Sequence, residues 1–153
     1  FADPESDPRG SGYNVVQAGI AIGSGGLTGQ GLFQGTRTTG AYVPEQHTDF
    51  IFTVAGEELG FLGATAVLLL LGLVLWRAVR ITARAQDTFG RLVGAGIVCW
   101  LAIQTFENVG MSLGLAPITG VPLPFVSYGG SSLVAVMAAI ALLENIHLST
   151  TER

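Results

Sequence analysis

Three long apolar stretches, separated by polar segments, dominate the chain after residue 50. A helix needs about 20 predominantly apolar residues to cross the hydrocarbon of a bilayer. The pattern predicts membrane spans over about 50–76, 92–115 and 127–147, the first interrupted only by Glu57 and Glu58. The apolar core of the third stretch is the shortest, and a buried helix of a soluble protein is its alternative. The predicted fold class is an all-α, polytopic membrane protein.

The segment before these stretches is rich in glycine. Residues 12–35 combine an apolar run with seven glycines between Gly19 and Gly35. Glycine permits sharp bends, and non-helical backbone at membrane depth is tolerated where protein covers it. We therefore expect residues 1–49 to form a loop outside the spans, with an interfacial or re-entrant segment. A phosphate-binding loop is disfavoured, because no lysine follows and no G-x-G-x-x-G frame is completed.

The loop between the second and third stretches has three prolines before a pair of glycines, Gly129 and Gly130. Proline fixes the backbone φ and removes a hydrogen-bond donor. We expect this loop, over about 116–130, to be extended or tightly turned and to restart a helix near Ser131 or Ser132. Gly129 and Gly130 are predicted to be structural.

The arginines predict the orientation, since positively charged short loops stay on the cytoplasmic side. The loop between the first two stretches has one acid, Asp87, and four basic residues: Arg77, Arg80, Arg84 and Arg91. Residues 1–49 and the loop 116–130 are therefore expected outside the cytoplasm, and the C-terminus inside.

The composition narrows the function classes further. Of the 153 residues, 49% are hydrophobic and only 12% are charged, whereas soluble domains have about 25% charged residues. A net charge of -4 argues against a nucleic-acid surface. The chain has no lysine, which removes the Walker A loop and lysine chemistry. A single cysteine, Cys99, permits no intrachain disulfide.

Acidic residues gather where the first span is expected to begin. If residues 49–57 are helical, Asp49 and Glu57 lie within an 80° arc and face one cavity, since successive residues turn by about 100°. The alternative is that Thr48 or Asp49 only caps the helix. Carboxylates inside membrane spans are costly and usually face a polar interior, which favours a functional role for Glu57 and Glu107. Packing against neighbouring helices is an equal alternative for Glu107.

Two further kinds of site find little support. His47 and Asp49 lack a third metal ligand, so a solvated loop histidine is the better interpretation. A triad of Ser24, His47 and Asp49 lacks a strained nucleophile turn and an oxyanion partner.

Three blocks of sequence resemble the C-terminal portion of the SEDS family of bacterial membrane proteins, which includes RodA, FtsW and SpoVE. The blocks are GYNVVQAGIAIGSGGLTGQGLFQGT, PEQHTDFIFTVAGEELGFLG and FENVGMSLGLAPITGVPLPFVSYGGSS. They cover most of the chain. The chain is more similar to the elongation branch, RodA, than to the division branch, FtsW, in the segments IAIGSGG, FENVGM and DTFGR.

The resemblance implies a peptidoglycan glycosyltransferase that polymerises lipid II in the bacterial cytoplasmic membrane during cell elongation. The essential aspartate of the family's PE-x-HTDF block maps onto Asp49, as the base for the acceptor hydroxyl or a group that positions it. Glu45, His47, Glu57 and Arg37 are predicted substrate-binding residues, the last as a pyrophosphate contact. Glu58 and Glu107 are predicted structural. A class B penicillin-binding protein of the elongation machinery is the implied partner. A divalent cation, Mg or Mn, would suit the pyrophosphate, but no ligand set is visible.

The chain departs from the family in extent. Family members have about ten spans, and only the last three are expected here. We therefore expect a fragment that is inactive alone and unstable when isolated, with polar groups such as Glu57 facing lipid. A lipid II flippase or transporter, and a scaffold without catalysis, are the alternative functions. A transporter needs acids reachable from both sides near the membrane midplane, whereas Asp49 is expected at the outer rim.

Overall fold

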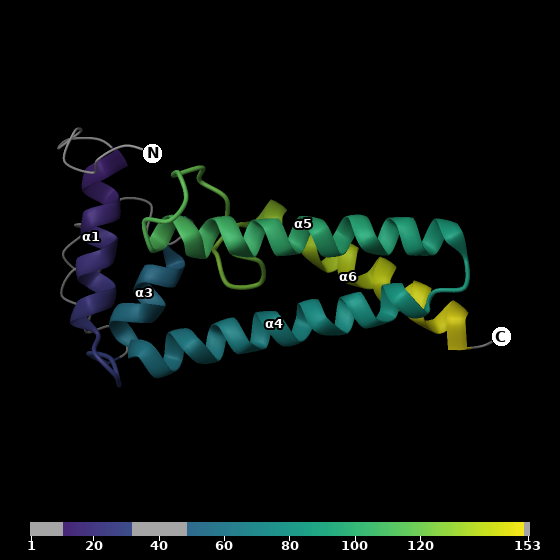
Figure 1. Ribbon diagram of the computed structural model, residues 1–153, viewed down its shortest axis with the longest axis horizontal. Coiled ribbons are helices and arrows are strands. Elements are labelled where there is room, and N and C mark those ends of the chain that lie inside the picture. Colours follow the sequence, from purple (N-terminus) through teal and green to yellow (C-terminus); the bar gives the residue numbers. More distant parts are fainter. Residues whose placement is uncertain (1–10, 32–48, 152–153) are drawn as a thin grey trace.

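A computed structural model describes residues 11–31 and 49–151 of the chain, and this part contains helices and no strand (Figure 1). The all-α prediction is confirmed. Three of its helices are long and apolar enough to cross a membrane, over Gly60–Arg84, Thr88–Ser112 and Gly130–Thr150. The helices are α1 (Ser11–Ser24), α3 (Ile51–Glu58), α4 (Gly60–Arg84), α5 (Thr88–Ser112) and α6 (Gly130–Thr151).

The three long helices form one bundle, and the two short ones lie at its end. Helices α4, α5 and α6 contact one another, and α4 and α5 converge toward the loop that joins them (Figure 1). Helix α1 stands across the end of this bundle and packs on α3 (Figure 1). The interfacial position expected for this segment stays a prediction.

The first predicted span differs most from the structure. A single helix was expected over 50–76, but α3 ends at Glu58 and a separate helix, α4, begins at Gly60. Gly60 has a φ of 68°, in the left-handed region that interrupts an α-helix. Helix α4 then extends to Arg84, which is 25 residues and enough for a span without α3. Glu57 and Glu58 therefore precede the span.

The glycine-rich turn after α1, residues 25–31, fills this helix break. A break leaves backbone groups of both helices without intrahelical partners. The turn supplies them: Gln30 N and Gly31 N donate to the carbonyls of Glu57 and Glu58 at 3.0 and 3.1 Å. In return Phe61 N donates to the carbonyl of Gly26 at 2.9 Å.

Such a close approach requires glycine. A Cβ on Gly25 would overlap the backbone oxygen of Gly56, and one on Gly29 would overlap that of Glu58. Gly29 also has a φ of 82°, which residues with a Cβ rarely adopt. The structural interpretation of the glycine run is therefore confirmed over the described turn.

The other two spans shift by a few residues from the prediction. Helix α5 begins earlier than residue 92 because the Asp87 side chain caps it, accepting from Gly90 N at 3.1 Å. Helix α6 begins at Gly130. A Cβ added to Gly90 would meet Ile146 of α6 at 3.6 Å, and one added to Gly94 would lie only 2.5 Å from Thr82 Oγ1 on α4, so small residues permit close helix packing here.

Candidate functional site

Asp49 lies where α3, the end of α5 and the loop over residues 113–129 meet. The side-chain amide of Asn108 on α5 donates two hydrogen bonds of 2.8 Å, one to the backbone oxygen of Asp49 and one to that of Val121. Asn108 is itself fully buried. The next residue, Phe50, is 2% exposed and packs with Ala18 of α1. The backbone of Asp49 is thus fixed from two sides.

The side chain of Asp49 is half-buried and lies against the loop. A Cβ placed on Gly120 would come within 3.2 Å of the Asp49 carboxylate oxygen Oδ2. Gly120 has a φ of 69° and is exposed, so the loop passes the carboxylate without covering it with a side chain. The helix-cap interpretation is wrong for Asp49, because the N-cap residue of α3 is Phe50 and no side chain caps it.

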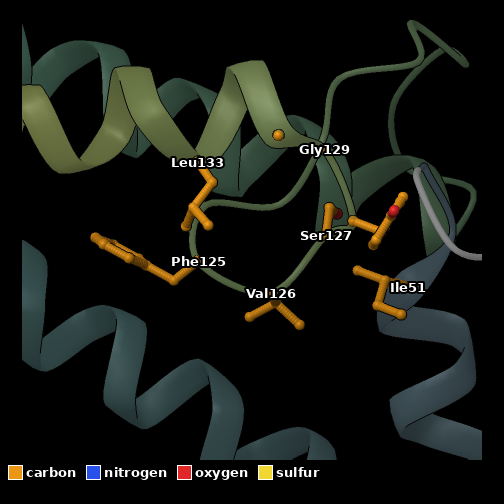
Figure 2. Close-up of a pocket in the computed structure, with 8 residues that line it drawn as sticks. Ile51, Phe125, Val126, Ser127, Gly129 and Leu133 are labelled. Atoms are coloured by element: carbon orange, nitrogen blue, oxygen red, sulfur yellow. The ribbon is translucent and has the colours of Figure 1, made fainter.

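A turn in the same loop forms one wall of an apolar groove. The Leu123 N–H donates to Ser127 Oγ at 2.7 Å, and Ser127 N donates back to the Leu123 carbonyl at 3.0 Å. Phe125, within this turn, has a φ of 65°, which is rare for a residue with a Cβ. Figure 2 shows Phe125, Val126, Ile51 and Leu133 around the groove, which has a volume of about 560 Å³. Ile51, two residues after Asp49, lines the groove, whereas Asp49 itself does not.

Polar side chains are buried near this end of the bundle. Thr53 and Glu57 on α3 are fully buried, as are Asn108 and Ser112 on α5, and Gln104 is 7% exposed. Thr53 Oγ1, Gln104 Oε1 and Asn108 Oδ1 have no hydrogen-bond partner within the structure. Glu57 was expected to face lipid in this chain, and that expectation is wrong: its backbone lies against Gly25 of the glycine-rich turn and its side chain is covered.

The other predicted residues are dispersed. Glu107 accepts a hydrogen bond of 3.1 Å from Thr119 Oγ1, which ties α5 to the loop. The Glu58 carbonyl accepts from the glycine-rich turn, and Gly129 lines the groove, with Gly130 starting α6. The Asp49 carboxylate lies beside Gly120 and the Glu57 backbone lies against Gly25, and a cavity shared by the two side chains stays a prediction. Arg37, Glu45 and His47 fall outside the described residues.

Sequence reasoning missed Asn108, Gly120 and Ser127. Asn108 interrupts the apolar second span, and an amide in an apolar helix is itself a signal of buried hydrogen bonding. The contacts of Gly120 and Ser127 depend on the path of the loop, which no local pattern specifies. Within residues 11–31 and 49–151, no three His, Cys, Asp or Glu side chains are grouped so as to hold a metal ion.

Comparisons with known proteins agree on one family. A family model for FtsW, RodA and SpoVE, described as "Cell cycle protein", matches residues 1–152. The chain is 50% identical over 145 residues to the peptidoglycan glycosyltransferase MrdB of Escherichia coli K12, covering 95% of this chain and 39% of MrdB. It is 47% identical over 146 residues to stage V sporulation protein E of Bacillus subtilis, covering 95% of this chain and 40% of that protein. The chain thus spans about two fifths of the length of these relatives.

Two solved structures share the fold. One, of a peptidoglycan synthase complex that coordinates polymerisation and crosslinking, has a TM-score of 0.74 at 31% identity over 96% of this chain and 39% of the other. The second is the rod shape determining protein RodA of Thermus thermophilus, in an aspartate-to-alanine variant. It has a TM-score of 0.65 at 33% identity over 91% of this chain and 50% of RodA. The chain is therefore part of a multi-pass membrane protein and belongs to the FtsW/RodA/SpoVE family, which is the SEDS family that its sequence motifs resemble.

Proposed function

We propose that the full-length protein containing this chain is a peptidoglycan glycosyltransferase that polymerises lipid II into glycan strands during cell elongation. The observation that carries the proposal is Asp49, a half-buried carboxylate whose backbone is fixed by Asn108 and whose side chain lies beside Gly120. The 50% identity to a peptidoglycan glycosyltransferase supports the same activity.

In the proposed reaction Asp49 acts as general base. It takes the proton from a hydroxyl of the acceptor sugar, whose oxygen then bonds to the anomeric carbon of the donor. The bond from that carbon to the pyrophosphate oxygen breaks, and undecaprenyl pyrophosphate leaves with the electron pair. A base must reach the hydroxyl before its pKa matters. The bare backbone of Gly120 beside the carboxylate supports such access.

The apolar groove fits a lipid-linked substrate. Its lining is mainly apolar, with Ser127 and Tyr128 as the polar side chains, and it includes Ile51, two residues after Asp49. We propose that a segment of polyprenyl chain lies against Phe125 and Leu133 while the sugar is held at the membrane surface. Ser127 fixes the turn that carries Phe125, so it positions the groove wall.

The orientation and the partner belong to the same proposal. The Asp49 end would lie outside the cytoplasm and the arginines inside, as the distribution of basic residues indicates. A class B penicillin-binding protein would crosslink the strands. The structure of a peptidoglycan synthase complex similar to this chain supports such a partner. Arg37, Glu45, His47 and Glu57 remain proposed substrate contacts. The described residues offer no ligand set for Mg or Mn, so no step is assigned to a metal.

A lipid II transporter is the second candidate function. The break between α3 and α4 and the fully buried Glu57 beside it favour this candidate, since broken helices and buried acids are features of transporters. It predicts movement of lipid II across the membrane without bond formation.

Proteoliposomes holding the full-length protein, its penicillin-binding partner and lipid II separate the two candidates. We expect glycan strands from lipid II in the leaflet that faces Asp49, and no transfer of unreacted lipid II between leaflets. Transfer without strands would contradict the glycosyltransferase proposal and favour the transporter.

A further inference from the structure

The end of the bundle opposite Asp49 has a cluster of arginines that the proposed function does not use. Arg77, Arg80 and Arg84 lie in the last turns of α4. At about 1.5 Å of rise per residue, they are roughly 25 Å or more along α4 from Gly60. Their spacing of three and four residues places them on one face of the helix. None of them forms an ion pair within the part of the chain that the structure describes.

This face forms a basic cleft together with α6. The cleft is lined by Arg77, Arg80, Arg84 and Ile81 of α4 and by His147 of α6. The guanidinium of Arg80 stacks over the ring of Trp76 at 4.8 Å from its centroid, which restrains its position. Guanidinium groups bind phosphate oxygens through two parallel hydrogen bonds. These three guanidinium groups therefore suit a phosphate group that lies over the cleft, whose own volume is only about 10 Å³.

An apolar groove continues from the cleft along the bundle. Its volume is about 420 Å³, and it shares Arg77 and Ile81 with the cleft. The remainder of its lining is mainly hydrophobic and comes from both helices: Leu73, Val74, Trp76, Ala78, Ile140 and Leu143. One acid, Glu144, also lines it, beside three arginines in the combined site. The combined site thus keeps a surplus of positive charge at one end and an apolar channel at the other.

We propose that this site binds one anionic membrane phospholipid, with its phosphate on Arg77, Arg80 and Arg84 and an acyl chain in the groove between α4 and α6. The arginines suit an anionic group, and the adjoining groove suits an apolar chain. A ligand that has both parts therefore fits the site better than a soluble anion does. Basic pockets between membrane helices bind anionic headgroups on the cytoplasmic side. If the arginines served only to set the orientation of the helices in the membrane, their charge would be sufficient. That role would require neither the apolar groove nor its position beside the cleft.

The test measures thermal unfolding of the full-length protein in detergent, titrated with phosphatidylglycerol, with phosphatidylcholine of the same chains, or with inorganic phosphate. Phosphatidylglycerol is expected to raise the unfolding temperature, and the other two are expected to leave it nearly unchanged. Arg80→Gln should weaken the apparent affinity about fivefold, and Arg80→Gln with Arg84→Gln more strongly. Arg91→Gln is the matched control, because it removes the same charge at the same end but lines neither cleft nor groove.

A second variant tests the groove with every arginine in place. Ile140→Trp fills the channel and should abolish stabilisation by phosphatidylglycerol while the protein still unfolds cooperatively in phosphatidylcholine. Equal losses in Arg80→Gln and Arg91→Gln would overturn the proposal in favour of general charge. Full stabilisation by inorganic phosphate, or an unchanged response in Ile140→Trp, would overturn the lipid assignment.

Discussion

The two ends of this bundle are built differently. The Asp49 end consists of α1, the turn 25–31, α3, the helix break at Gly60 and the loop 113–129, and it holds every residue with positive φ among those the structure describes. Its backbone groups are paired between segments distant in sequence, as between Gln30 and Glu57. The arginine end consists of regular stretches of α4, α5 and α6 and the short turn between α4 and α5, where Arg77, Arg80, Arg84, Asp87 and Arg91 are exposed.

The difference shows where irregular backbone is permitted in a membrane protein. Lipid offers no hydrogen bonds, so non-helical backbone persists only where protein pairs it. At the Asp49 end the glycine-rich turn and Asn108 provide that pairing. The result is a fixed backbone at Asp49, at the end of the bundle, which helices alone would not position.

The largest effect on stability is expected from Gly29→Ala. Its φ of 82° and the overlap of a Cβ with the Glu58 backbone should cost about 2–4 kcal/mol and separate the turn from the helix break. Thermal unfolding of the full-length protein measures the loss. Gly72→Ala on α4 is the control, since a Cβ there meets nothing within 4 Å. Equal unfolding temperatures for both variants would contradict the role of the turn.

The second largest loss of stability is expected from Asn108→Leu. It leaves the carbonyls of Asp49 and Val121 without their donor, which should cost about 2–3 kcal/mol and lower polymerisation further than stability explains. The measurements are unfolding temperature and the rate of glycan-strand formation at a temperature where the variant is folded. Asn145→Leu, at an exposed position of α6, is the control. A wild-type rate in Asn108→Leu would show that Asp49 needs no such support.

Ser127→Ala should have a smaller effect, confined to the groove. Loss of the hydrogen bond from Leu123 N should cost about 1 kcal/mol and loosen the turn that carries Phe125. We expect a raised KM for lipid II with a nearly unchanged kcat. Ser149→Ala, at the other end of α6, should leave both constants unchanged. A change in kcat alone would argue that the groove does not bind the substrate.

Thr53→Val should have the smallest effect. The buried Thr53 Oγ1 has no partner in the structure, so its replacement by a methyl group should change the unfolding free energy by less than about 1 kcal/mol, in the stabilising direction. Equilibrium unfolding in detergent measures this. A loss greater than this would indicate a bound water or ligand at the hydroxyl.

The sequence predicted the regular part of the fold and less of the irregular part. Hydropathy located three spans because apolar length is a local property. It could not locate the break at Gly60, since the break depends on hydrogen bonds from the turn 25–31. Likewise Asp49 was found through its motif, whereas its support by Asn108, 59 positions later, depends on tertiary contact. The catalytic role of Asp49 stays a prediction.

The central claim is that the charge of Asp49 drives polymerisation. The most direct measurement compares glycan-strand formation from lipid II by the full-length protein and its partner in wild type, Asp49→Asn and Asp87→Asn, at matched membrane levels. Asp87 caps α5 at the other end, and asparagine caps about as well. We expect Asp87→Asn to polymerise normally and Asp49→Asn to lose about 10²–10⁴-fold in rate while remaining folded. Polymerisation by Asp49→Asn at the wild-type rate would contradict the account.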